Sequence, residues 1–306
     1  MKFLINAGTD RGIVKKVNED RMAFQKARTL DGKNIAFAVL CDGMGGLRQG
    51  EVASGTLVQA FERWFKEEVE LFSVREFDIE RLKNQWIQVY ESVNQRLLMY
   101  GMQKGIQLGT TVVAMFIIED RYVILNIGDS RIYELGEHSK ILTSDHTKVA
   151  LKVKRGEITP SQAEKDPEGN ILTQCVGATN RIFPEFIVGK LKPHYVYMLC
   201  SDGFRHVVRL EEFEKKFNYM NMQDEIHIKQ EINYMIGIIK KRKEYDNISA
   251  IIITPVFDEN IEYDQTFKNL DFIQENIKRL NDVKKFKKQF FGNLFLQRQK
   301  ERKKRK

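Results

Sequence analysis

Residues 34–46 read Asn-Ile-Ala-Phe-Ala-Val-Leu-Cys-Asp-Gly-Met-Gly-Gly, an apolar run that stops at an Asp-Gly pair. The stretch 34–41 predicts a buried strand, because nearly continuous apolar character over so few residues suits a strand covered on both faces. Beyond the glycines, helical spacing of apolar residues predicts a long helix that carries Leu57, Phe61, Trp64 and Phe65. A strand, a turn with a carboxylate and a covering helix therefore follow one another here.

The rest of the chain repeats these elements. Helical spacing predicts a second helix through Ile79, Leu82, Trp86, Val89, Val93 and Leu97, and a third over 225–239. Further strands are predicted over 3–7, 21–25, 110–118, 121–127, 131–135, 140–143, 195–200 and 248–254. Runs of strands alternate with runs of helices. This order favours an α+β fold of antiparallel sheets covered by helices over a doubly wound parallel sheet.

Carboxylates stand at the ends of several predicted strands. Acids lie within two residues of the end of five of them: Glu19-Asp20, Asp42, Asp129, Asp202 and Asp246. Adjacent strands lie about 5 Å apart, so several such ends at one sheet edge would bring carboxylates close together. Like charges that close raise one another's pKa unless a cation holds them. The spacing therefore predicts a cation site.

Oxygen ligands of this kind favour Mg²⁺ or Mn²⁺ over Zn²⁺. Two such ions about 3.5–4 Å apart could activate a water molecule and orient a phosphate for in-line attack without a nucleophilic side chain. Two other interpretations stay open from spacing alone. Each Asp-Gly pair is also an ordinary turn signal, and a carboxylate-lined calcium site would need no catalysis.

Composition limits the remaining classes. No apolar run approaches the ~18 residues of a membrane span, and the start of the chain is too briefly apolar for a signal peptide, so we expect a cytoplasmic protein. Cys41, Cys175 and Cys200 are too widely spaced for a zinc set or a disulfide framework, and we expect buried free thiols.

A set of segments then resembles the PPM, or type 2C, metal-dependent Ser/Thr protein phosphatases, particularly compact bacterial members. The resemblance covers roughly residues 3–255. It rests on Thr9–Asp20, Cys41-Asp-Gly-Met-Gly-Gly46, Gly109-Thr-Thr111, Asn126-Ile-Gly-Asp-Ser-Arg131, Leu142-Thr-Ser-Asp-His146, Leu172–Gly177, Cys200-Ser-Asp-Gly203 and Asp246-Asn247. Each piece is weak by itself, and the ordered set is specific.

The resemblance implies a four-layer α/β/β/α sandwich of two mainly antiparallel sheets, and hydrolysis of phosphoserine and phosphothreonine in proteins. It implies two Mn²⁺ or Mg²⁺ ions, with a third, weaker ion in some members, and a Ser/Thr kinase as the opposing partner. The roles carried over are Asp42 as the bridging ligand, the Gly43 carbonyl on one ion, Asp202 with Asp246 on the other, Asp129 with Asp202 on the third, and Glu19 with Asp20 holding metal-bound water.

Two positions depart from the family's pattern. Lys15 stands where members usually have a phosphate-binding Arg, and Lys keeps the charge but loses the bidentate fork. Met44 stands where many eukaryotic members have His, which leaves the proton donor unassigned. A binding module without turnover and a mainly regulatory phosphatase are the competing interpretations. We expect a structural role for His146, and an influence on substrate choice for the polar stretch 148–170, which matches the family's flap.

Residues 256–306 lie outside the resemblance and form a predicted basic amphipathic extension. Eleven basic residues and one acid lie within 284–306, a net +10, which leaves −2 for the rest of a chain whose total is +8. A helix docked on the body with a solvated end, an anionic membrane surface and a partner protein all fit this pattern. Nucleic acid is the least favoured, since charge alone binds it weakly.

Overall fold

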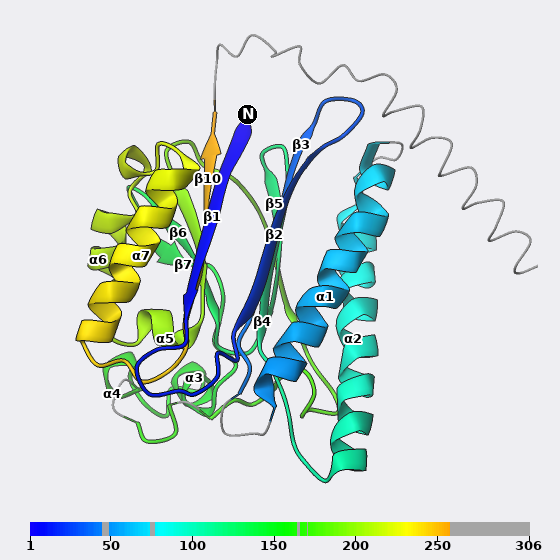
Figure 1. Ribbon diagram of the computed structural model, residues 1–306, viewed down its shortest axis with the longest axis vertical. Helices are drawn as coiled ribbons and strands as arrows, with labels where there is room; N and C mark the ends of the chain where they lie inside the picture. The colour runs from blue at the N-terminus through cyan, green and yellow to red at the C-terminus, as the bar shows by residue number, and fades with distance from the viewer. Residues whose placement is uncertain (45–48, 74–76, 164–165, 170, 258–306) are drawn as a thin grey trace, which may run out of the picture. The chain divides into compact units, whose positions relative to one another are not determined.

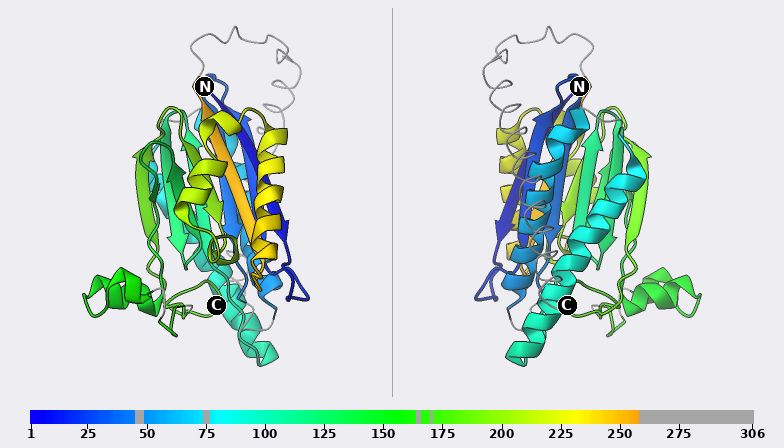
Figure 2. Two further views of the ribbon diagram at one scale, coloured as in Figure 1. Left: turned by 90° about the vertical axis from the view of Figure 1, so that its left-hand side faces the viewer. Right: turned by 90° about the vertical axis from the view of Figure 1, so that its right-hand side faces the viewer.

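The computed structural model describes residues 1–44, 49–73, 77–163, 166–169 and 171–257. The predicted extension lies outside these ranges except for its first two residues. Two five-stranded antiparallel sheets form the body (Figures 1 and 2). One has the order β1 (Lys2–Asp10), β10 (Ile248–Val256), β9 (Val196–Cys200), β6 (Arg131–Leu135), β7 (Lys140–Ile141). The other has the order β2 (Arg21–Arg28), β3 (Asn34–Cys41), β4 (Val112–Ile118), β5 (Arg121–Ile127), β8 (Glu185–Lys190).

Helices cover the outer face of each sheet. The long helices α1 (Gly50–Glu68) and α2 (Ile79–Lys104) lie on the β2–β8 sheet, and α5 (Asp202–Arg205), α6 (Leu210–Lys216) and α7 (Glu225–Lys241) lie on the other (Figure 1). Shorter pieces are α3 (Lys148–Lys154), α4 (Pro160–Ala163) and the 3₁₀ turns η1 (Val69–Ser73) and η2 (Tyr219–Asn221). The predicted α/β/β/α sandwich is confirmed.

Strand β3 shows why its sequence is apolar throughout. Its odd-numbered residues, such as Phe37, face α1 and α2, whereas Ala36, Ala38 and Leu40 pack between the two sheets. Phe37 meets Trp64 with ring centroids 5.4 Å apart. A central strand in a four-layer sandwich is buried on both faces, and the alternation of polar and apolar residues disappears.

Most predicted strands and helices are confirmed, with different ends. The second helix extends to Lys104 and ends at Gly105, whose φ of 63° is the left-handed conformation that stops a helix. The predicted strand 140–143 is only Lys140–Ile141. Among the helices in the described residues, none combines the length and the apolar character that a membrane crossing demands.

Candidate metal centre

Strand register brings Asp20 and Asp42 to the same end of the β2–β8 sheet. β2 and β3 are antiparallel, and Arg21 at the start of β2 pairs with Cys41 at the end of β3. Asp20 comes directly before the first of these residues and Asp42 directly after the second. The two carboxylates are therefore neighbours across a pair of strands, although 22 positions separate them in the sequence.

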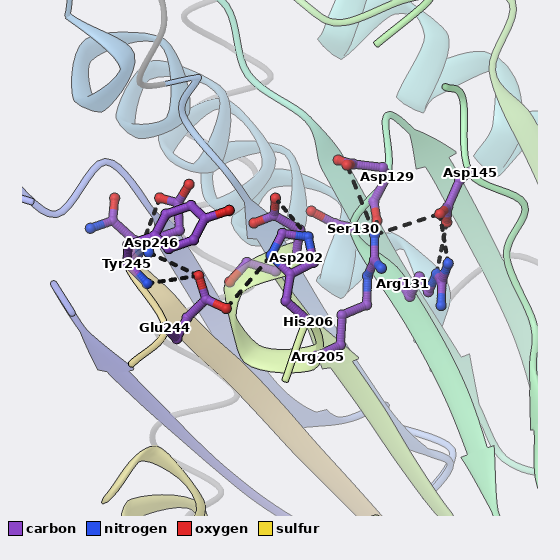
Figure 3. Close-up of polar contacts among 12 residues, drawn as sticks. Asp129, Ser130, Arg131, Asp145, Asp202, Arg205, His206, Glu244, Tyr245 and Asp246 are labelled. Carbon is purple, nitrogen blue, oxygen red and sulfur yellow. Dashed lines mark hydrogen bonds and ion pairs between the residues drawn. The ribbon is translucent and has the colours of Figure 1, made fainter. Parts of the chain in front are cut away.

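The other sheet contributes three more carboxylates at its own end. Cys200, the last residue of β9, pairs with the first residue of β6 on one side and the third residue of β10 on the other. Asp129 lies two residues before β6, Asp202 two residues after Cys200, and Asp246 two residues before β10. Figure 3 shows these three aspartates in a row along the strand ends.

A short bridge joins the two sheet ends. Thr111 donates its backbone N–H to the Asp42 carbonyl at 2.9 Å, and its hydroxyl lies 2.8 Å from that of Ser130, the neighbour of Asp129. The electrostatic influence of Asp202 also extends to Asp20 and Asp42 on the other sheet. All five aspartates thus belong to one cluster built from both sheets.

Two glycines allow the backbone to pass through this crowded region. A Cβ on Gly43 would lie 2.5 Å from the Gly50 carbonyl oxygen and 2.6 Å from that of Glu19. A Cβ on Gly203 would lie 2.2 Å from the Asn247 carbonyl oxygen. Each Asp-Gly pair therefore does more than turn the chain, because the missing side chain lets the neighbouring carboxylate approach the cluster.

The electrostatics of the cluster call for positive charge. The pKa of Asp129 is raised to about 7, mainly by burial and then by the charge of Asp202. The pKa of Asp20 is also raised to about 7, by burial and by the charges of Asp202 and Asp246. Part of Asp42 reaches solvent, yet burial and four aspartates raise its pKa well above the usual range. These shifts are typical of carboxylates crowded together without a cation.

Asp20 gives the test of whether a cation fits. The residue is buried, and neither carboxylate oxygen makes a hydrogen bond of normal geometry, although the hydroxyls of Ser201 and Ser249 lie near enough to favour its charged form. Buried polar atoms normally have partners. Within the described ranges, no three Asp, Glu, His or Cys side chains already enclose one point, so an ion would need carbonyl oxygens and water as well. Mg²⁺ and Mn²⁺ accept such mixed oxygen ligands, and the residues fit them.

Lys15 supplies one positive charge to the cluster. Its Nζ lies 2.8 Å from Asp246 Oδ1 and 4.0 Å from Glu19 Oε2. Burial opposes the charged form, but the hydrogen bond to Asp246 and the carboxylates of Glu19 and Asp42 outweigh it and raise the pKa of Lys15. Lys15 is therefore a fixed cation at the edge of the site, in contact with a predicted metal ligand.

Glu19 lies beside the cluster and has a different set of contacts. Its Oε1 accepts a hydrogen bond from the backbone N–H of Gly50 at the start of α1, at 3.2 Å, where the helix dipole favours negative charge. Burial still raises the pKa of Glu19, with the charge of Lys15 opposing the shift.

An arginine network that the sequence analysis missed supports the Asp129 loop. Arg131 donates two hydrogen bonds to Asp145, at 2.8 and 2.7 Å, and Arg205 Nη2 lies 3.5 Å from the same carboxylate. Arg205 also donates to the Asp129 carbonyl at 3.1 Å (Figure 3). Asp145 and Arg131 were noticed only as parts of motifs, and nothing local in the sequence shows that Arg205 reaches both.

A second missed group lies behind Asp202 and Asp246. His206 has Nε2 at 3.5 Å from Asp202 and Nδ1 at 3.7 Å from the buried Glu244 (Figure 3). Glu244 accepts the backbone N–H groups of Tyr245 and Asp246, at 2.9 and 3.0 Å. The positions of two predicted ligands are thus linked through His206 and Glu244. The sequence held one signal for these two residues, because His206 comes four residues after Asp202 and Glu244 two residues before Asp246.

The remaining predictions near the site concern His146 and the flap. His146 Nδ1 accepts the backbone N–H of Gly128 at 3.1 Å, and Gln174 Nε2 lies 2.8 Å away, so the ring supports the turn before Asp129. Burial lowers the pKa of His146. In the flap, Lys152 pairs with Asp166 and Glu168, each at 2.9 Å, so these charges satisfy one another.

The raised carboxyl pKa values predict how stability depends on pH when a chelator removes metal. The folded chain holds protons on Asp20 and Asp129 up to about pH 7, whereas the unfolded chain releases them near pH 4. These protons therefore stabilise the folded chain fully below about pH 4, and this contribution is lost as the pH rises to about 7, by on the order of 4 kcal/mol for each carboxyl. Urea unfolding at pH 5 and pH 7.5 with EDTA would measure the decline.

Asp20→Asn is the matched variant for this measurement. It keeps the side-chain shape and removes the charge, so the decline between the two pH values should shrink. A chelated natural chain that gains stability over the same interval would contradict the prediction.

Comparison with known proteins agrees with the geometry. Residues 7–234 match the family model described as "Protein phosphatase 2C", and the chain belongs to this family. The serine/threonine phosphatase stp of Listeria monocytogenes serotype 4b is 32% identical over 213 residues, which cover 68% of this chain and 80% of that protein.

Solved structures share the fold. The serine/threonine phosphatase Stp1 from Staphylococcus aureus superimposes with a TM-score of 0.71 and 27% identity, covering 84% of this chain and 96% of that one. The catalytic domain of the phosphatase PstP, solved with two manganese ions, gives a TM-score of 0.65 at 23% identity and covers 84% of this chain and all of that one.

Proposed function

We propose that this chain is a metal-dependent protein Ser/Thr phosphatase, which hydrolyses phosphoserine and phosphothreonine in other proteins. The observation that carries the proposal is the convergence of five aspartates from both sheets, with both oxygens of the buried Asp20 left without hydrogen bonds of normal geometry. The relatives named serine/threonine phosphatase support the reaction, and the manganese-bound PstP domain shares the fold.

The chain's acids would hold two ions, Mn²⁺ or Mg²⁺. In our proposal Asp42 would be a ligand shared by both ions, the Gly43 carbonyl would be a ligand of one, and Asp202 with Asp246 would be ligands of the other. Asp129 with Asp202 would take a third, weaker ion. Bound together, two divalent ions lower the pKa of a water molecule and offset the charge of a phosphoryl group.

Other side chains would position the water and the substrate. Glu19 and Asp20 would accept hydrogen bonds from water at the ions and so fix its orientation. Lys15 would contact the phosphate as a point charge, since its ammonium group already stands at the edge of the cluster.

The cysteines are poorly suited to nucleophilic catalysis. All three are buried and free, and burial raises the pKa of Cys200 to about 12 and raises that of Cys41 and Cys175. A thiol attacks as its thiolate, which these environments disfavour.

Release of phosphate from a phosphothreonine peptide tests the proposal. We expect turnover with Mn²⁺ or Mg²⁺, loss of turnover to background with excess EDTA, and recovery when Mn²⁺ is restored. Calorimetry should show metal binding in parallel. A folded chain that binds Mn²⁺ without turnover would instead favour a binding module. From the sequence we also propose that a Ser/Thr kinase opposes this phosphatase. For the basic extension we propose contact with an anionic membrane surface or with a partner protein.

A further inference from the structure

The loop between β1 and β2 is fixed at both ends beside the metal centre. Asn247, the neighbour of Asp246, donates from Nδ2 to the Arg11 carbonyl at 3.0 Å and to the Val17 carbonyl at 3.2 Å. Its Oδ1 accepts the backbone N–H of Glu19 at 2.9 Å. One side chain therefore holds the start and the end of the loop against the strand end that carries a predicted ligand.

The loop also lies directly on the backbone of that strand end. Gly12 has a φ of 76°, and a Cβ there would be 2.2 Å from the Asp246 carbonyl oxygen. Its N–H donates to Asp10 at 2.9 Å, and Asp10 pairs with Lys240 of α7 at 2.8 Å. These contacts give the segment a defined conformation next to the site.

This anchored loop holds three aliphatic side chains in solvent. Ile13 is 50% exposed, Val14 66% and Val17 49%. Lys15 lies between them in the sequence and has its ammonium group on Asp246. Single exposed apolar residues are ordinary, but a group of them in a fixed loop beside a candidate active site indicates a binding surface.

We infer that Ile13, Val14 and Val17 form a docking surface for the substrate segment next to the phosphorylated residue, and that it selects apolar side chains there. The inference rests on the proposed function. In the proposed complex the phosphate lies near Lys15 and the adjacent metal ligands. Each further residue of an extended peptide lies about 3.3 Å from the one before it, so the residues on either side of the phosphorylated one come within reach of this loop. Lys15 already pairs with Asp246 and lies near Glu19, so its charge is engaged within the site. Arg11 and Lys16 of the same loop are exposed, so the peptides compared below carry no acidic residue at the flanking positions.

The test compares three substrates of the full chain with Mn²⁺. The first is p-nitrophenyl phosphate. The second is a phosphothreonine peptide in which the two residues before and the two residues after the phosphothreonine are Leu and Val. The third is the same peptide with Ser and Gly at these four positions. We expect the natural chain to show roughly tenfold higher kcat/KM for the apolar peptide, mainly through KM, as hydrophobic pockets discriminate by about this much. Equal values for both peptides would overturn the inference while leaving the phosphatase proposal standing. No hydrolysis of any substrate would count against the phosphatase proposal itself.

The triple variant Ile13→Ser/Val14→Ser/Val17→Ser should bring the ratio of the two peptides close to one, with little change on p-nitrophenyl phosphate. Met220→Ser is the matched control, because Met220 is an apolar residue that is 74% exposed and lies far from the site. It belongs to η2, where the neighbouring Tyr219 packs on His194. His194 comes just before the start of β9, whereas the candidate site lies at the end of that strand. An equal fall on all three substrates would overturn the inference, since the loop would then shape the site itself. A changed oligomeric state with an unchanged ratio would also overturn it, because the surface would then belong to a second copy.

Discussion

Asp202→Ala should reduce turnover of a phosphothreonine peptide by more than about 100-fold at saturating Mn²⁺. Residues that only orient a metal ligand typically contribute 10–100-fold, so loss of a ligand is expected to exceed that range. Asp202 is central to the cluster, because its charge contributes to the raised pKa of Asp20, Asp42 and Asp129. Steady-state kinetics and calorimetric Mn²⁺ titration of the same preparation would measure both losses.

The variant should fold as well as the natural chain when metal is absent. Removing one of several mutually repelling carboxylates relieves the others, so its stability in EDTA should equal or exceed that of the natural chain. Asp120→Ala is the matched control, because Asp120 lies in the β4–β5 turn at the far end of the sheet and pairs with Lys190 at 3.4 Å. If Asp202→Ala retained more than a tenth of the turnover, Asp202 would not be an essential ligand.

Asp145→Ala should produce a large loss of stability, about 3 kcal/mol. Asp145 is 15% exposed and accepts contacts from Arg131 and Arg205, which are 25% and 13% exposed. The variant removes the ion-pair partner of Arg131 and leaves Arg205 only the more distant Asp129 carboxylate, at 3.9 Å. Removing one member of a buried ion pair typically costs about 3–5 kcal/mol, and the remaining exposure and the second partner of Arg205 favour the low end. Urea unfolding of both proteins at the same pH and metal concentration gives the difference.

A surface pair provides the comparison for Asp145. Arg242 also binds Glu212 through two nitrogens, but these side chains are 39% and 29% exposed. Glu212→Ala should therefore cost at most about 1 kcal/mol. Equal losses for the two variants would show that burial does not distinguish the pairs.

The sequence could predict the sandwich and the carboxylate cluster because both depend on local signals. The apolar run of β3 and the helical spacing around Trp64 are visible without any partner, and each acid stands beside a recognisable strand end. Bringing the five aspartates together required only that the strand ends meet. The register then placed Asp20 beside Asp42 as the strand boundaries implied.

The missed features depend on contacts between distant segments or on weak local patterns. Strand β8 escaped prediction because it is an edge strand, with Glu185 and Lys190 at its ends, a glycine within it and no fully buried residue. The short helices α5 and α6 were missed for the same reason, since four and seven residues carry little periodicity. The pairing of Arg205 with Asp145 spans 60 positions, and no spacing rule predicts such a contact.

The division of the cluster between two sheets has a consequence for how the protein holds together. Asp20 and Asp42 lie at the end of one sheet, and Asp129, Asp202 and Asp246 lie at the end of the other. The layer between the sheets consists of apolar contacts, which hold the distance between the two sheets more firmly than the position of one sheet along the other. Ions shared by both groups would act as a crosslink at one end of the sandwich. The sheets could then separate or slip only by releasing metal, so the same ions that support hydrolysis would also couple the two halves into one unfolding unit.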